Sequence, residues 1–244
     1  RSTMLPVAAN RELWRLLRDG VAVELRQADG SLKLDRVRVI DWVNPNANDF
    51  FVASQTWVAS ELYKRRPDVV GFVNGLPLLL CEWKAPGQGV QEAYDANLAD
   101  YRDTVPRVFD ANGFVVLSNG LEALMGASHA PFEAYAPWKK LDEDGPESVE
   151  LATLLRATCE PARFLDLIEN FTLFEEARGG LRKVLAKYHQ VLGVNRAIDA
   201  VRQIEHNRGR LGVFWHTQGS GKSLSMVMFA EKALRRLGGN WTFV

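Results

Sequence analysis

Two apolar segments joined by Asn74-Gly75 constrain the fold of this chain more than any other feature. Residues 68–73 and 76–84 are rich in Val, Leu and Phe, and Asn-Gly between two such runs is the strongest short-range signal for a β-hairpin. Residues 87–101 carry apolar side chains at helical spacing, which predicts a helix, and residues 114–117 predict a short buried strand. Strands, a helix and a further strand in this order predict a mixed α/β fold.

Charged residues lie at the ends of these two apolar segments. Asp68 opens the first strand, and Glu82 and Lys84 close the second, where isolated charges are unusual. A regular two-residue turn would pair Asp68 with Cys81 and point it away from Glu82. One bulge or a longer loop restores the match, and Pro77, which cannot donate to the ladder, favours such an irregularity. We therefore predict an irregular hairpin with Asp68 beside Glu82 and Lys84.

Such a cluster suits phosphodiester hydrolysis. Asp68, Glu82 and a main-chain carbonyl can bind Mg²⁺, which polarises a phosphate and lowers the pKa of a bound water. Lys84 can orient that water or stabilise the phosphate. Asn97 and Tyr101 are four residues apart on the predicted helix and share a face that could position Lys84 or a phosphate. The alternatives are a surface ion pair between Glu82 and Lys84, and an apolar helix face with exposed tyrosine tips.

A glycine–lysine loop is the second signature. Residues 211–215 predict a strand, His216-Thr217-Gln218-Gly219-Ser220-Gly221-Lys222-Ser223 follows, and residues 224–237 predict a helix. In this setting glycines let main-chain N–H groups turn toward phosphate oxygens, Lys222 would reach the β- and γ-phosphates, and Ser223 would hold Mg²⁺. His216 stands where the strict pattern has a glycine. The sequence predicts an ATP site made by Gly219, Ser220, Gly221, Lys222 and Ser223.

ATP hydrolysis also needs an acidic residue on a later strand and, in motor ATPases, a second domain. Residues 241–244 predict only the start of a further strand. We therefore expect this chain to be the front part of a longer protein, with a phosphate loop that does not hydrolyse ATP by itself.

Residues 139–150 separate the two signatures. They are charged, contain Gly145-Pro146 and show no apolar period, which is typical of a linker. Apolar residues at spacings of three and four then predict helices over 151–171 and 182–203. We expect three parts: an α/β domain over 1–145, a helical connector over 146–207, and the beginning of a nucleotide-binding domain over 208–244.

The composition is that of a globular chain. Of 244 residues 47% are hydrophobic, which is enough for a substantial core. No run approaches the ~18 apolar residues of a membrane-spanning helix, so no membrane association is expected. Two cysteines are too few for a disulfide scaffold. Reducing conditions, and hence a cytoplasmic location, are the expectation.

The charge is balanced, with 30 basic and 30 acidic side chains, which argues against a protein that coats DNA. It still permits a nucleic-acid enzyme with a local basic groove. Lys64, Arg65 and Arg66 precede the carboxylate hairpin and are predicted to contact DNA phosphates. A solvated basic turn is the alternative. Acidic residues gather elsewhere, over 142–150.

With both signatures in order, the chain resembles the restriction (motor, or R) subunit of Type I restriction-modification enzymes. The resemblance spans nearly the whole sequence and also explains His216, because this family lacks the first glycine too. The segments that carry it are Asn48-Asp49-Phe50 with Gln55, Arg66-Pro67-Asp68-Val69-Val70, Glu82-Trp83-Lys84, Ser118-Asn119-Gly120, Asn170-Phe171, Tyr188-His189-Gln190 and the run from Trp215 to Ser223.

The resemblance implies a nuclease domain of the PD-(D/E)xK type, a mixed sheet flanked by helices, followed by two RecA-like helicase domains. Asp68, Glu82 and Lys84 would be the nuclease triad, with Asp68 and Glu82 as the Mg²⁺ ligands. The next helix of the family carries Gln-x-x-x-Tyr. Tyr101 matches its tyrosine, whereas Asn97 stands in place of the glutamine and has a shorter reach.

The resemblance also implies that Gln190 reads adenine through its amide, as a glutamine upstream of the phosphate loop does in helicases of this superfamily; the alternative is a helix-surface glutamine. The implied function is ATP-dependent translocation along, and Mg²⁺-dependent cleavage of, double-stranded DNA by an endodeoxyribonuclease. Modification (methyltransferase) and specificity subunits would be its partners. An alternative of another class is a non-catalytic module that binds DNA or a subunit and is fused to a superfamily 2 helicase motor.

Overall fold

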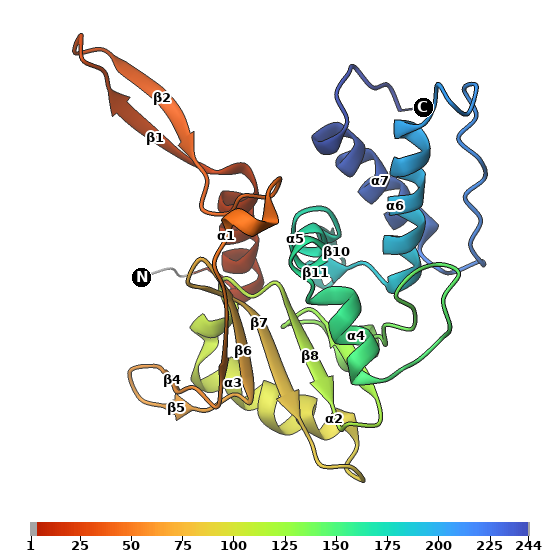
Figure 1. Ribbon diagram of the computed structural model, residues 1–244. Helices are drawn as coiled ribbons and strands as arrows, with labels where there is room; N and C mark the ends of the chain where they lie inside the picture. The colour runs from red at the N-terminus through yellow and green to blue at the C-terminus, as the bar shows by residue number, and fades with distance from the viewer. Residues whose placement is uncertain (1–3, 244) are drawn as a thin grey trace.

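The computed structural model describes residues 4–243, and its centre is a five-stranded mixed sheet in the order β3-β6-β7-β8-β9 (Figure 1). The strands are β3 (Phe50–Ser54), β6 (Val69–Val73), β7 (Leu76–Trp83), β8 (Phe114–Ser118) and β9 (Ala123–Gly126). Neighbouring strands are antiparallel except β7 and β8, which run parallel. The mixed α/β class and the predicted hairpin and buried strand are therefore confirmed.

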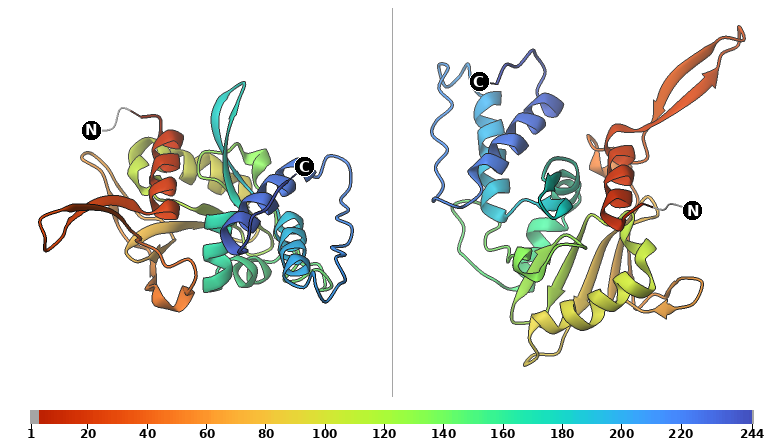
Figure 2. Two further views of the ribbon diagram at one scale, coloured as in Figure 1. Left: turned by 90° about the horizontal axis from the view of Figure 1, so that it is seen from above. Right: turned by 180° about the vertical axis from the view of Figure 1, so that it is seen from behind.

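Parallel strands cannot be joined by a tight turn, and a helical segment connects β7 to β8. It consists of α2 (Val90–Glu92), a π-helical stretch (Ala93–Leu98) and α3 (Ala99–Thr104). Leu98 from this segment shares a buried cluster with Leu80 and Val115 of the sheet. The segment therefore covers one face of the sheet (Figure 2), and the predicted helix is confirmed with shifted ends. Short 3-10 helices lie at Pro45–Ala47, Pro106–Phe109 and Phe132–Ala134.

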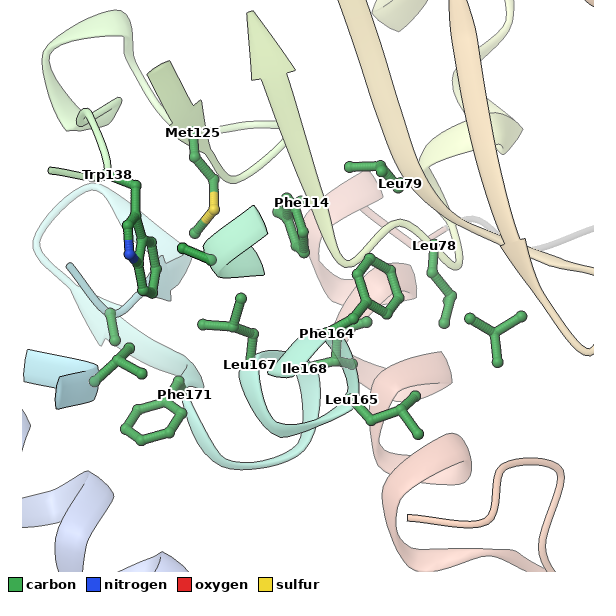
Figure 3. Packing of buried hydrophobic residues seen from close by; sticks show 14 of the residues in the cluster. Leu78, Leu79, Phe114, Met125, Trp138, Phe164, Leu165, Leu167, Ile168 and Phe171 are labelled. Carbon is green, nitrogen blue, oxygen red and sulfur yellow. The ribbon is translucent and has the colours of Figure 1, made fainter. Parts of the chain in front are cut away.

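The opposite face of the sheet is covered by α5 (Pro161–Asn170). Its Phe164 packs beside Phe114 of β8 with ring centroids 5.3 Å apart, in a cluster that also holds Leu78 (Figure 3). α1 (Pro6–Asp19) joins the same cluster through Trp14, whose indole N–H donates to the carbonyl of Ile168 at 2.7 Å. The sheet is thus buried between two helical layers.

The β6–β7 hairpin contains the predicted irregularity. Its turn is a regular two-residue turn, but the pairing of the strands shifts at Leu78, which has no partner on β6. This β-bulge changes the register beyond it. Cys81 pairs with Val69 rather than with Asp68, so that Asp68 comes opposite Glu82. One extra residue on β7 thereby aligns the two predicted acids.

Two smaller hairpins flank the sheet. β1 (Val21–Arg26) and β2 (Leu32–Val37) form an antiparallel ribbon that extends away from the body (Figure 1). β4 (Val58–Ala59) and β5 (Lys64–Arg65) form a short hairpin between β3 and β6 in sequence. The second hairpin therefore leads the chain directly into Asp68.

Residues 139–150 contain no helix or strand, as predicted, and α4 (Leu151–Thr158) and α5 follow as expected. The helix predicted over 182–203 is wrong in its first part. β10 (Thr172–Ala177) and β11 (Gly180–Leu185) form an antiparallel hairpin, and α6 spans only Tyr188–Arg202. Gly180, which follows the two-residue turn at 178–179, has φ of +102°, a value that a helix does not contain. The connector is therefore a mixture of helices and a hairpin.

α7 (Lys222–Arg236) packs against α6 and confirms the last predicted helix. The strand predicted over 211–215 is wrong: this run is irregular, and Val213 is 93% exposed. A strand exists only where a neighbour pairs with its N–H and C=O groups, and no described residue pairs with this run. Residues 241–243 are irregular too, and Val244 lies outside the described residues. Within residues 4–243, no helix is long and apolar enough to cross a membrane.

Candidate active site

The bulged hairpin brings two carboxylates together at one end of the sheet. Asp68 directly precedes β6, and Glu82 is the last but one residue of β7. The main-chain N–H of Asp68 donates to Oε1 of Glu82 at 3.2 Å, and the N–H of Trp83 donates to Oδ2 of Asp68 at 2.8 Å. Each carboxylate is thus held by the main chain beside the other acid, which fixes their relative position.

Asn97 connects Lys84 to this pair. Lys84 follows β7, and its main-chain N–H donates to the carbonyl of Ser118 at 2.8 Å, which extends the pairing with β8. The ammonium of Lys84 donates to Oδ1 of Asn97 at 2.8 Å, and Nδ2 of Asn97 donates to Oε2 of Glu82 at 2.9 Å. A bridging amide therefore stands where the alternative interpretation placed a direct ion pair between Glu82 and Lys84.

Tyr101 of α3 completes the cluster. Its hydroxyl donates to Oε1 of Glu82 at 2.7 Å, and its ring is buried. Asn97 lies in the π-helical stretch and Tyr101 in α3, so two residues four apart reach the two oxygens of one carboxylate. The predicted shared face is present, and the alternative of exposed tyrosine tips is wrong for Tyr101. Short π-helical stretches occur frequently at functional sites.

Burial dominates the electrostatics of the cluster. Glu82 is 1% exposed. Burial raises its pKa to about 7, the hydrogen bond from Tyr101 opposes this rise, and the nearby Asp68 carboxylate adds to it. Burial and the bond to Glu82 raise the pKa of Tyr101 well above its usual value, which keeps its hydroxyl a donor. The ionised form of Glu82 is therefore costly unless a cation compensates it.

The donor set fits a hard divalent cation. Asp68 and Glu82 offer carboxylate oxygens, which Mg²⁺ prefers, and the raised pKa of Glu82 reflects a negative charge that burial leaves poorly compensated. In the part of the chain that the structure describes, no group of three or more His, Cys, Asp or Glu side chains is placed to hold a metal. A third protein ligand would be a main-chain carbonyl, such as that of Trp83, which follows Glu82 in the sequence, or an amide or hydroxyl oxygen.

The three predicted DNA-contacting residues differ in their surroundings. Lys64 and Arg66 are exposed. Arg65 is not available in the same way, because its guanidinium forms a two-point ion pair with Asp100 of α3, including a bond from Nη2 to Oδ1 at 2.7 Å. This pair ties β5 to the helix that carries Tyr101. Of the three, only Lys64 and Arg66 are exposed, and contact with DNA phosphates stays a prediction.

One contact of the cluster comes from a residue for which the sequence suggested no chemistry. Nε2 of Gln55, just after β3, donates to Oδ1 of Asp68 at 2.5 Å. Gln55 belongs to the segments that carry the family resemblance, and this was the only signal that could have drawn attention to it. The two residues are thirteen apart in sequence and meet because β3 pairs with β6.

The glycine–lysine loop lies at the N-terminus of α7. Gly219 and Gly221 have φ values of +79° and +82°, which glycine adopts readily. Lys222 is the first residue of α7, and its ammonium donates to the carbonyl of His216 at 2.9 Å and to that of Thr217 at 3.4 Å. The five residues predicted to bind ATP phosphates are therefore contiguous at a helix N-terminus, although the strand before them is missing.

Gln190 belongs to this second cluster. It is 3% exposed, so the interpretation as a helix-surface glutamine is wrong. Its Oε1 accepts the main-chain N–H of Lys187 at 2.8 Å, and its Nε2 donates to the carbonyl of Gly221 at 3.0 Å. A cavity of about 580 Å³ lies here, lined by Tyr188, Gln190, residues 219–221 and Lys183. Gln190 thus joins α6 to the loop beside a space of ligand size.

The fold and its polar clusters define an α/β protein with a buried carboxylate cluster around Glu82 and a separate glycine–lysine loop. The family model described as Type I restriction enzyme R protein N terminus matches residues 1–134, and the model described as SWI2/SNF2 ATPase matches residues 189–244. The chain belongs to the family of Type I restriction enzyme R proteins.

Curated relatives agree with this membership. The Type I restriction enzyme HindI endonuclease subunit of Haemophilus influenzae is 38% identical over 239 residues, which cover 93% of this chain and 23% of that protein. The SauCOLORF180P endonuclease subunit of Staphylococcus aureus is 25% identical over 91% of this chain and 23% of its own length. The SsaAORF53P endonuclease subunit of Staphylococcus saprophyticus is 25% identical over 86% and 22%. The chain spans less than a quarter of the length of these relatives.

Proposed function

We propose that this chain is the nuclease-bearing N-terminal part of the DNA-translocating and DNA-cleaving subunit of a Type I restriction enzyme. The proposed reaction is Mg²⁺-dependent hydrolysis of phosphodiester bonds in double-stranded DNA at a PD-(D/E)xK site. The observation that carries the proposal is the hydrogen-bonded convergence, in a chain of this family, of Asp68, Glu82, Lys84, Asn97 and Tyr101.

Each side chain has a distinct part in this proposal. Asp68 and Glu82 hold Mg²⁺, which when bound polarises the phosphate and lowers the pKa of a water. Tyr101 and Asn97 orient Glu82 by donating to its two oxygens. Asn97 also accepts from Lys84 and so places its ammonium next to the carboxylates. There the positive charge can stabilise the negative charge that grows on the attacked phosphate.

The glycine–lysine loop is the proposed ATP site of the full-length protein. Residues 219–223 hold phosphates, and Lys222 exchanges the carbonyls of His216 and Thr217 for phosphate oxygens. Gln190 reads adenine from the adjoining cavity. We assign 1–145 to the nuclease domain, 146–207 to the connector and 208–244 to the start of a RecA-like domain. Double-stranded DNA and the methyltransferase and specificity subunits are the proposed partners, in the cytoplasm.

Cleavage by the assembled full-length enzyme tests the nuclease site. Supercoiled plasmid, ATP and Mg²⁺ are supplied, and nicking is compared between the wild type, Glu82→Ala and Lys84→Ala. We expect each variant to lose at least about a hundredfold in cleavage rate, because a metal ligand or the phosphate-facing cation is removed. ATP hydrolysis should persist in both. Lys33→Ala, on the exposed β1–β2 ribbon, is the matched control and should cut like the wild type.

The same experiment separates the second candidate function. A domain that only grips DNA or a partner subunit would leave cleavage unchanged in both Glu82→Ala and Lys84→Ala. That result would reject the assigned site. The intact hydrogen-bond network around Glu82 favours the nuclease over the binding module, because each of its donors is aimed at a carboxylate oxygen.

A further inference from the structure

We propose that Gln55 is a positioning residue that fixes the metal-binding carboxylate of Asp68 and links it to the basic β4–β5 hairpin. This inference rests on the proposed nuclease function and adds a residue to it. Gln55 forms two hydrogen bonds to Asp68. Its side-chain amide donates to Oδ1 at 2.5 Å, and its main-chain N–H donates to the Asp68 carbonyl at 2.9 Å.

The amide of Gln55 completes the restraint on Asp68. Oδ2 of Asp68 accepts the main-chain N–H of Trp83 at 2.8 Å, so one oxygen is held by β7 and the other by Gln55. Two donors on two oxygens fix the rotation of the carboxylate about its χ angles. Without Gln55 only the bond from Trp83 would remain, and the carboxylate could turn about it. Hydrogen-bond partners that orient the ligating carboxylates strengthen metal binding.

The backbone of Gln55 indicates that the side chain is required there. Its φ is +53°, in the left-handed region that disfavours residues other than glycine. Strained residues of this kind gather at functional sites, where the surrounding contacts hold them. A glycine would adopt this conformation without strain, but it would lack the amide that reaches Asp68. Gln55 therefore combines an unfavourable backbone conformation with a hydrogen bond to the proposed metal ligand Asp68.

Arg66 connects Gln55 to the basic segment over 64–66, which is proposed to face DNA. Its Nε donates to the carbonyl of Gln55 at 3.0 Å, and its guanidinium lies 5.7 Å from the ring centroid of Trp57. Both Arg66 and Trp57 are exposed. The neighbouring Arg65 binds Asp100, which precedes Tyr101. Two consecutive arginines thus attach to the supports of the two acids, Arg66 to the support of Asp68 and Arg65 to that of Glu82.

Two substitutions at position 55 separate positioning from a merely structural role. Gln55→Ala removes the amide and keeps the strain, whereas Gln55→Gly removes the amide and relieves it. We expect both to raise the Mg²⁺ concentration for half-maximal cleavage by about tenfold, with the maximal rate largely kept. Gln55→Gly should melt no lower than the wild type. Gln27→Ala, in the exposed turn between β1 and β2, is the matched control.

A second readout does not depend on cleavage. Calorimetric titration of the full-length protein with Mn²⁺ should show affinity weakened by about tenfold in Gln55→Gly and Gln55→Ala. Wild-type metal dependence and affinity in both variants would overturn the inference. If Glu82→Ala and Lys84→Ala also cut like the wild type, the nuclease assignment itself fails. If those two variants are inactive while both position-55 variants behave as wild type, only the role of Gln55 is rejected.

Discussion

The side-chain amide of Gln190 donates to the main-chain carbonyl of Gly221 at 3.0 Å, which ties the start of α6 to the glycine–lysine loop. Gly221 has φ of +82°, and a Cβ atom at this position would lie 2.7 Å from Nε2 of Gln190. Such an approach is closer than a side chain permits. A side chain at position 221 would therefore push the Gln190 amide out of this contact, and the positive φ favours glycine as well.

Substitution of Gly221 should disrupt the loop. We expect Gly221→Ala in the full-length protein to weaken binding of a fluorescent ATP analogue by at least about tenfold, because the new methyl group displaces Gln190. Gly209→Ala is a matched control: Gly209 has φ of +79°, so the backbone strain is the same, but its Cβ would meet open space. Equal loss in the two variants would show that the contact with Gln190 does not account for the effect of Gly221→Ala.

Glu82 should make stability depend on pH when no divalent cation is present. Its pKa of about 7 lies above the usual 4.5, so the folded protein binds an extra proton between these values and loses stability as pH rises through them. Glu82→Gln removes this titration. We expect the variant to be more stable than the wild type at pH 8 by on the order of 2–3 kcal/mol, and by much less at pH 5.

Denaturant unfolding in EDTA at the two pH values measures this difference. Parallel pH profiles for wild type and Glu82→Gln would contradict the assignment of the titration to Glu82. With Mg²⁺ present the wild type should become the more stable of the two proteins at pH 8, because the cation binds its ionised carboxylate and stabilises only that protein.

Asn97 should act on the rate of cleavage. It bridges Lys84 and Glu82, so Asn97→Ala frees the lysine to pair directly with the acid and withdraws both from their present geometry. We expect a fall of about tenfold or more in the single-turnover cleavage rate. Asn97→Gln keeps an amide and should retain more activity than the alanine variant. Equal rates for Asn97→Ala and wild type would remove Asn97 from the site.

Lys183 gives a test of stability at a residue that lines the cavity beside Gln190 but belongs to neither hydrogen-bonded cluster. It is 7% exposed on β11, its Nζ donates to the carbonyl of Asn112 at 2.6 Å, and burial lowers its pKa to about 7. Because this pKa lies below the usual 10.5, the unfolded chain binds more protons between pH 7 and 10.5, and Lys183 destabilises the fold increasingly as pH falls through that window. Asn10 also donates to the Asn112 carbonyl, so that group keeps a donor without Lys183.

We therefore expect Lys183→Met to melt higher than the wild type, with a larger gain at pH 6 than at pH 10. Each kcal/mol of stabilisation should raise the melting temperature by roughly 2–4 °C in a chain of this size. Lys33→Met, at an exposed position, is the control and should change little at either pH. A gain of the same size at both pH values would exclude the charge of Lys183 as its cause.

The carboxylate site could be predicted from sequence because its main constraints are local. Asn-Gly sets the turn, Pro77 favours an irregular strand, and a helix of apolar period places Asn97 and Tyr101 on one face. The contacts of Arg65 and Gln55 could not be predicted in this way, because their partners are distant in sequence. Arg65 meets Asp100 from 35 residues away, and no spacing rule connects them. Such contacts depend on how the elements pack.

The errors in secondary structure have physical causes as well. Val184 and Leu185 of β11 lie close before the apolar residues of α6, and together they imitate a helical period across the boundary at Lys187. The run over 211–215 has the composition of a strand, but composition cannot supply the neighbour that a strand needs. Periodicity therefore located the helices well and the partners of strands poorly.

α7, a continuous helix of 15 residues, joins the glycine–lysine loop to the sheet domain. Lys222 at its first turn belongs to the loop, Lys232 binds Asp166 of α5 at 2.6 Å, and Arg236 at its last turn donates to the carbonyl of Trp42 at 2.8 Å. Sharp kinks in helices arise mainly at proline or glycine, and neither interrupts this one. α7 therefore connects the loop directly to α5, on the side of the sheet away from Glu82, and a displacement of the loop would be passed along the helix to α5.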